Sequence, residues 1–303
     1  MKTTMNHEDF LEAYLKDRQK IVEEALERYL PDEDSVPEEL HTAAHYSVFA
    51  GGKRIRPILC LAAAEACGAD MAPAMPAACA LELIHTYSLI HDDLPAMDND
   101  DVRRGKATSH KVFGEAMAIL AGDALLTEAF VLLSRVEKVR LPAERRLAVI
   151  QEIATAAGIA GMVGGQALDI RAEKIPPDVE GLVEIHRRKT GALIIASVRT
   201  GAILAGAGEE KLSALTQYAS RIGIAFQIAD DILNVEGDSR LMGKKTGSDA
   251  AHGKVTYPSL LGMDAAKARL AEHVEAAVAA LAAFDARALP LRVIARYIME
   301  RKS

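Results

Sequence analysis

The sequence predicts one all-α domain, residues 1–303, made of about ten helices. Apolar residues recur at spacings of three and four almost throughout the chain, which is the helical period. Glycine and proline interrupt this pattern where helices should end. Alternating polar and apolar runs typical of strands are missing, and no low-complexity linker divides the chain.

The first predicted helix runs through Leu11 and Leu26 to Tyr29, and Pro31 ends it. Alanine-rich stretches such as 276–283 favour helix intrinsically and allow close helix packing. Further helices are expected over residues 37–50, 55–67, 73–94, 115–136, 143–173, 178–205, 209–236, 255–282 and 287–301. The breaks between helices are expected at Gly51-Gly52, Gly68, Pro142, Pro176-Pro177, Gly206 to Gly208, Gly237 and Gly243.

Composition excludes several classes of protein. Lys and Arg number 36 against 43 Asp and Glu, a net charge of −7, whereas nucleic-acid binding normally needs a basic face. No run of 18 uncharged apolar residues exists, so no membrane span is expected. The first thirty residues are too charged for a signal peptide, which predicts a cytoplasmic protein. The three cysteines include no CxxC pair and predict buried thiols.

Five aspartates fall between Asp92 and Asp101, directly after a strongly apolar stretch. They are therefore expected at the end of a buried helix. Pro95 biases Leu94 out of the helical region, so the chain can turn back there. Carboxylates at a helix C-terminus are unfavourable unless cations offset them. The alternative is a solvated acidic loop.

A second acidic cluster shares one helix face, because Gln227, Asp230, Asp231 and Asn234 lie at i−3, i, i+1 and i+4. Apolar flanks predict that this helix is largely buried, and adjacent buried aspartates are costly without cations. Oxygen ligands without His or Cys suit Mg²⁺, which also keeps waters and borrows phosphate oxygens. The two clusters, brought face to face, would hold several Mg²⁺ ions between them.

Cationic residues are grouped as well. Residues 51–57 form a glycine pair that leads into a basic helix start, and residues 103–106 follow the first acidic cluster. Arginine forks match phosphate oxygens, and helix N-termini add backbone donors. Cations beside carboxylates predict polyphosphate binding, with a surface ion-pair network as the alternative.

Several motifs together resemble the trans-isoprenyl diphosphate synthases. They are GGKRIRP (51–57), DDLPAMD (92–98) with RRG (103–105), GGQ (164–166), KT (189–190), FQIADD (226–231) and GKVTYP (253–258). Residues 85–98, HTYSLIHDDLPAMD, most resemble the bacterial farnesyl diphosphate synthases. The resemblance implies a helical bundle around a central cavity and a homodimer, for which residues 115–136 offer an apolar face.

The resemblance also implies a reaction. An allylic diphosphate, dimethylallyl and then geranyl, loses its diphosphate and is attacked by isopentenyl diphosphate, which gives trans,trans-farnesyl diphosphate. Such synthases use Mg²⁺, here about three ions per active site. The same chemistry stopping at C20 is the near alternative. A class I terpene cyclase and a non-catalytic regulatory subunit are remote ones.

By the same resemblance, the direct Mg²⁺ ligands are Asp92, Asp98 and Asp230, supported by Asp93 and Asp231. The allylic diphosphate is bound by Arg103, Lys189 and Lys254. Isopentenyl diphosphate is bound by Lys53, Arg56, His85 and Arg104. Thr190 and Gln227 present oxygen dipoles to the carbocation, and Lys244 belongs to a loop that closes over the site.

Product length is assigned to Tyr87 and Ser88. In the resembled family an aromatic residue five positions before the first aspartate limits tail growth, and with Ser88 beside it the pattern is that of C15 synthases. A plain core tyrosine is the alternative. Asn234 stands where the second motif often has a third aspartate. Related C20 synthases also have an asparagine at this position.

Overall fold

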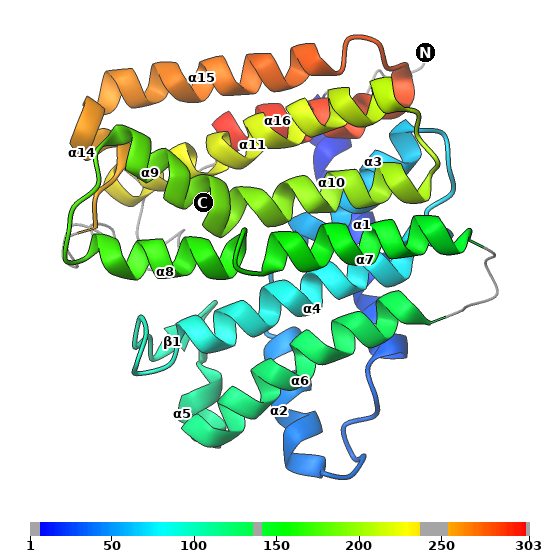
Figure 1. Ribbon diagram of the computed structural model, residues 1–303, viewed down its shortest axis with the longest axis vertical. Coiled ribbons are helices and arrows are strands. Elements are labelled where there is room, and N and C mark those ends of the chain that lie inside the picture. The colour runs from blue at the N-terminus through cyan, green and yellow to red at the C-terminus, as the bar shows by residue number, and fades with distance from the viewer. Residues whose placement is uncertain (1–6, 136–140, 237–253, 301–303) are drawn as a thin grey trace. The chain divides into compact units, whose positions relative to one another are not determined.

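The computed structural model describes residues 7–135, 141–236 and 254–300 (Figure 1). These residues are almost entirely helical, which confirms the all-α class. The chain forms two compact units. Unit 1 comprises residues 1–61 and 71–150, and unit 2 comprises residues 62–70 and 151–303. The single-domain expectation stays a prediction.

Unit 1 is built on α4 (Met75–Asp92), which packs against α6 (Glu115–Ser134) and contacts two further helices, α1 and α2 (Figure 1). Most of α4 is buried, because apolar residues lie on several of its sides. The remaining elements of this unit are α1 (His7–Tyr29), α2 (Glu38–Val48), η1 (Ala72–Ala74) and α5 (Ser109–Phe113). The boundary between the units falls within α3 (Ile55–Ala66) and α7 (Ala143–Ala157).

A short hairpin interrupts the helices of unit 1. β1 (Val102–Arg103) pairs antiparallel with β2 (Lys106–Ala107). The two turn residues, Arg104 and Gly105, have φ of 52° and 76°, as in a type I′ turn. Strands of two residues are too short to show alternation in the sequence, so this hairpin was not predicted.

Unit 2 is built on α11 (Glu209–Glu236), which lies beside α15 (Met263–Ala280) and also contacts η2, α10 and α16 (Figure 1). The apolar face of α11 is buried in these contacts. The other elements of this unit are α8 (Met162–Ala172), α9 (Val179–His186), η2 (Arg187–Gly191), α10 (Ala192–Leu204), α14 (Tyr257–Leu261), η3 (Ala286–Ala288) and α16 (Leu289–Glu300).

Three predicted helices are divided in the structure. The stretch 143–173 breaks between α7 and α8, and 255–282 breaks at Gly262, whose φ is +83°. The stretch 178–205 is interrupted by η2, a single π-helical turn. A Cβ at Gly165 in α8 would lie 2.2 Å from the Lys189 backbone nitrogen, so α8 and η2 are in backbone contact. Periodicity alone does not reveal such a contact.

Two segments of the described chain are long and apolar enough to cross a membrane by length and composition: α6 and residues 143–172. This is weak support for a span, because a core helix of a soluble protein passes the same test. Residues 143–172 are moreover divided into α7 and α8 by a turn.

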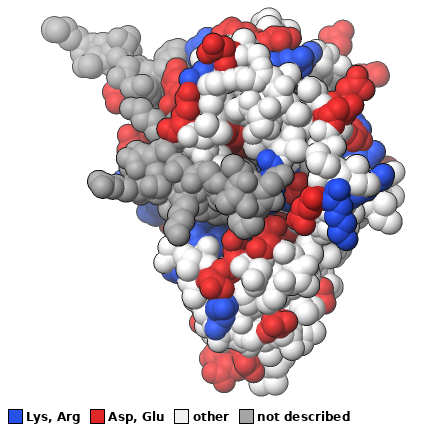
Figure 2. All heavy atoms as spheres, turned by 90° about the vertical axis from the view of Figure 1, so that its left-hand side faces the viewer, with Lys and Arg blue, Asp and Glu red and all other residues white. Residues whose placement is uncertain are grey.

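On the face that Figure 2 shows, acidic and basic side chains lie next to one another in several places. Among the described residues, Arg188 pairs with Glu184 and Lys267 pairs with Glu236. Surface charge is therefore of mixed sign on that face.

Candidate active site

The first aspartate motif begins where α4 ends. After Asp92 the chain turns back, and the Asp98 backbone N–H donates to the Asp92 carbonyl oxygen at 2.8 Å. The Asn99 N–H closes the same turn on the Leu94 carbonyl at 3.1 Å. Asp92 and Asp98 therefore belong to one turn, as the position of Pro95 predicts.

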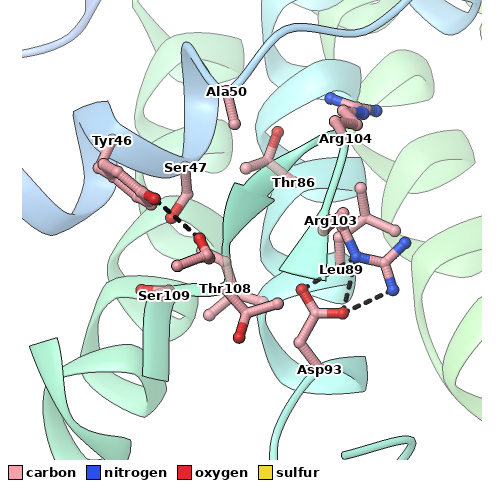
Figure 3. Close-up of a pocket in the computed structure, with 12 residues that line it drawn as sticks. Tyr46, Ser47, Ala50, Thr86, Leu89, Asp93, Arg103, Arg104, Thr108 and Ser109 are labelled. Carbon is pink, nitrogen blue, oxygen red and sulfur yellow. Dashed lines mark hydrogen bonds and ion pairs between the residues drawn. The ribbon is translucent and has the colours of Figure 1, made fainter. Parts of the chain in front are cut away.

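Asp93 is buried and bound by Arg103 from β1. The Arg103 Nε lies 2.7 and 2.9 Å from the two Asp93 carboxylate oxygens, and its Nη2 lies 2.6 Å from Oδ1. Figure 3 shows the guanidinium against this carboxylate, with Arg104 pointing away from it. A bidentate pair of this kind fixes both side chains. Asp93 thus orients Arg103, which fits the supporting role predicted for it.

The two basic motifs of unit 1 meet at the glycine pair. Arg104 donates to the Gly51 carbonyl oxygen, and Gln19 Nε2 donates to the Gly52 carbonyl oxygen at 3.2 Å. The hairpin turn thereby places Arg104 beside the residues that precede Lys53. Residues about 50 positions apart in the sequence are brought together here, as polyphosphate binding requires.

His85 lies among these cations. Burial lowers its pKa well below the usual value, and the charges of Arg56 and Arg104 lower it further. Its imidazole is therefore neutral at pH 7 and carries one N–H donor. The structure thus brings together three of the four residues predicted to bind isopentenyl diphosphate, Arg56, His85 and Arg104.

Unit 2 contains a pocket of about 300 Å³ at the second aspartate motif. It gathers predicted residues from η2, from α11 and from the segment that precedes α14. Among the residues that line it are Asp169, Lys189, Gln227, Asp230, Asp231 and Lys254. Carboxylates and lysines therefore line the same cavity, which suits a metal-bound diphosphate.

Internal contacts orient the side chains of this pocket. Lys189 Nζ lies 2.6 Å from an Asp169 carboxylate oxygen, and the Tyr257 N–H donates to Asp231 at 2.8 Å. Gln227 Nε2 lies 3.5 Å from Asp230 Oδ2. Asp231 therefore ties α11 to the start of α14, which again fits a supporting role.

The remaining predicted residues are placed as follows. Thr190 lies in η2 beside Lys189, and Asn234 lies one turn after Asp230 on α11. Lys53 precedes α3. Lys244 lies outside the described residues.

Tyr87 and Ser88 lie on α4, one turn before the first motif. Tyr87 is buried, and its ring meets that of His91 edge-on at 5.7 Å. Burial raises its pKa, and the charge of Asp92 raises it further, so the phenol and this carboxylate are near one another. The Ser88 hydroxyl donates to the His85 carbonyl oxygen at 2.8 Å.

The donor set is suited to magnesium. Within the described residues, no group of three or more His, Cys, Asp or Glu side chains is placed to hold a metal ion by itself. Mg²⁺ does not need such a cage, because it takes one or two carboxylates and completes its shell with water and phosphate oxygens. The aspartate oxygens of the two motifs fit that requirement.

Three residues near the predicted ones were not predicted: Asp169, which pairs with Lys189, and Arg54 and Glu82, which form a buried ion pair in which Arg54 Nη1 donates to Glu82 Oε1 at 2.8 Å. Glu82 had a signal, since it is a charged residue inside the apolar stretch before the first motif and a buried charge needs a partner. Asp169 follows the GGQ motif by three residues, which is one helical turn. Arg54 stands inside the basic motif, where its different role has no sequence signal.

The sequence was compared with known protein families and with characterised proteins. Residues 37–286 match the polyprenyl synthetase family. The chain is 48% identical over 291 residues to the farnesyl diphosphate synthase of Geobacillus stearothermophilus, covering 96% of this chain and 98% of the relative. It is 46% identical over 291 residues to the geranylgeranyl diphosphate synthase of Cyanophora paradoxa, covering 96% of both.

A solved structure agrees. The FPP/GFPP synthase of Zymomonas mobilis superimposes with a TM-score of 0.86 at 40% identity, over 95% of this chain and 98% of that one. The motif residues described above lie within the matched range. This chain belongs to the polyprenyl synthetase family.

Proposed function

We propose that this chain is a farnesyl diphosphate synthase, a Mg²⁺-dependent prenyltransferase. It condenses isopentenyl diphosphate with dimethylallyl diphosphate and then with geranyl diphosphate. One observation carries the proposal: the chain holds two groups of charged side chains of different chemistry, each suited to a diphosphate. One consists of arginines around a neutral His85, and the other is a pocket of carboxylates and lysines.

Each group suits one substrate. The allylic diphosphate must leave, so it is bound where Mg²⁺ and cations stabilise the departing charge. The residues proposed for Mg²⁺, about three ions in all, are Asp92, Asp98 and Asp230, and those proposed for the diphosphate are Arg103, Lys189 and Lys254. Isopentenyl diphosphate keeps its diphosphate, so it can be bound without metal. Lys53, Arg56 and Arg104 would supply the positive charge, and His85 would be a neutral hydrogen-bond donor.

Two further residues would stabilise the carbocation that forms during the reaction. The allylic C–O bond breaks, the isopentenyl double bond attacks to form the new C–C bond, and a proton is then lost. Thr190 and Gln227 present oxygen dipoles to the transient positive charge, which apolar side chains cannot stabilise.

A C15 product is supported by the buried ring of Tyr87 next to the first motif. A C20 product is the second candidate. It is favoured by Asn234 and by the 46% identity to a geranylgeranyl diphosphate synthase.

Product analysis tests the function. Purified protein is given Mg²⁺, isopentenyl diphosphate and dimethylallyl diphosphate, and the dephosphorylated products are separated by chromatography. Farnesol is the expected main product. Geranylgeraniol would replace the C15 assignment by C20, and no condensation at all would contradict the proposed reaction.

Asp92→Ala should lower kcat by about a thousandfold, because it removes a charge that holds the metal on the leaving diphosphate. The fold should survive, since Asp92 lies at the end of α4 and is not fully buried. Steady-state kinetics at saturating Mg²⁺ measure the loss. Asp101→Ala is the matched control, because that exposed carboxylate pairs with Lys111 at the surface. Unchanged turnover of the Asp92 variant would remove this residue from the ligand set.

Tyr87→Ala should lengthen the product beyond C15, because it removes a buried ring beside the first motif. Chromatography of the products with excess isopentenyl diphosphate measures the shift. Ile84→Ala, one turn earlier on α4 and equally buried, is the comparison. If Ile84→Ala lengthens the product and Tyr87→Ala does not, the stop lies at Ile84.

We infer that α6 forms the interface of a homodimer and does not span a membrane, while the cytoplasmic location stays a prediction from the sequence. Ile119 and Leu120 on this helix are 43% and 52% exposed, and Val131 is also exposed. A second copy of the chain covering this face would bury it. Light scattering should give the mass of a dimer, and Leu120→Glu should shift it towards the monomer. A monomeric parent protein would refute the interpretation.

A further inference from the structure

A buried ion pair lies inside the basic motif. Arg54 Nη1 donates to Glu82 Oε1 at 2.8 Å, and Nη2 donates to the Val48 carbonyl oxygen at 2.7 Å. Arg54 is 2% exposed and Glu82 is 1% exposed. Arg54 also has a φ of +51°, a left-handed conformation that non-glycine residues seldom adopt.

Stability alone does not explain this pair. Desolvating two charges offsets most of their attraction, and apolar residues of similar volume often replace a buried pair without loss of stability. The left-handed backbone at Arg54 costs further free energy. Because both the buried charges and the backbone conformation cost free energy, we expect the pair to hold neighbouring residues in position.

The pair occupies a central place in the motif. Arg54 lies between Lys53 and Arg56, and Glu82 precedes His85 by one turn of α4. The ion pair therefore connects the loop that carries two predicted substrate cations to the helix that carries the predicted histidine. A shift of the pair would move Lys53 and Arg56 relative to His85.

Other contacts hold the same loop. Gly51 accepts a hydrogen bond from Arg104, and Gly52 accepts one from Gln19. Glu23 Oε1 lies 3.5 Å from Arg54 Nε and 3.2 Å from Gln19 Nε2. The backbone is thus held at both glycines, and Arg54 anchors the end of the loop where α3 begins.

Glu82 also supplies negative charge. Its carboxylate raises the pKa of Arg104, although burial, the larger effect, lowers it. One buried carboxylate therefore offsets repulsion between Arg54 and Arg104 before any diphosphate arrives. Glu82 is buried, so it does not compete with substrate.

We propose that Arg54 and Glu82 are positioning residues of the isopentenyl diphosphate site, which hold Lys53 and Arg56 in register with His85 and do not touch the substrate. This inference rests on the proposed function of that loop. The Arg54 guanidinium is committed to Glu82 and to the Val48 carbonyl, so it serves the protein interior.

The experiment compares four variants, the last of which is Lys53→Ala. Glu82→Gln keeps the shape and one acceptor but removes the charge. Arg54→Met/Glu82→Leu removes both charges and leaves apolar side chains of similar size. Arg199→Met/Glu152→Leu is the matched control, because it removes a half-buried ion pair of 2.8 Å between α10 and α7 that lies outside the basic motif. Melting temperature, kcat and the KM of each substrate are measured for every variant.

Glu82→Gln should raise the KM for isopentenyl diphosphate by at least about tenfold, since a displacement of about 1 Å costs up to a hundredfold. Its KM for dimethylallyl diphosphate should stay within about twofold of the parent. Arg54→Met/Glu82→Leu should melt close to the parent and still show the raised KM for isopentenyl diphosphate. The control pair should change neither KM.

Two results would overturn the proposal. If the melting temperature of Arg54→Met/Glu82→Leu and its KM for isopentenyl diphosphate both equal those of the parent, the pair serves stability alone. If that variant does not fold, Glu82→Gln decides, and an unchanged KM for isopentenyl diphosphate refutes positioning. Lys53→Ala separates the two hypotheses. If Lys53→Ala is the one variant that raises the KM for isopentenyl diphosphate, the loop binds this substrate but Arg54 and Glu82 do not position it. If Lys53→Ala leaves this KM unchanged, the loop is not the isopentenyl diphosphate site.

Discussion

A charge among apolar helices is tolerated only when an opposite charge or a hydrogen bond compensates for its lost hydration. This constraint governs the two units of the protein. Arg54 pairs with Glu82, Asp93 pairs with Arg103, and Lys189 pairs with Asp169. Each functional motif is therefore also a local network, and its side chains are oriented before any substrate is bound.

The constraint divides work within each aspartate pair. The second aspartate of each pair binds the protein itself, Asp93 to an arginine and Asp231 to the Tyr257 backbone. The first aspartates, Asp92 and Asp230, precede them on the same helices. Neighbouring residues of identical chemistry thus acquire different tasks, because adjacent positions on a helix point in directions about 100° apart. The aspartates proposed to bind Mg²⁺ and the aspartates that bind the protein are thus adjacent in the sequence.

Helical periodicity predicted most of the architecture, since apolar spacing reports directly which face of a helix is buried. It failed where the cause was not periodic. The π-helical turn with Lys189 depends on the backbone contact at Gly165, and the hairpin with Arg104 has strands of two residues. The motif residues were recognisable because their chemistry is unusual in an apolar chain. Glu82 and Asp169, their internal partners, look like ordinary single carboxylates in the sequence.

The sequence by itself determined the all-α class, the family and the set of carboxylates and cations available for chemistry. The class and the set of charged residues follow from local spacing and residue type, and the family follows from the resemblance of its motifs. Only the tertiary structure decided which partner each charge has. It committed Arg54 to the interior although Arg54 stands between Lys53 and Arg56, and it bound Arg103 to Asp93. The physical reason is that pairing of charges depends on distance in space, and packing brings together residues that are far apart along the chain.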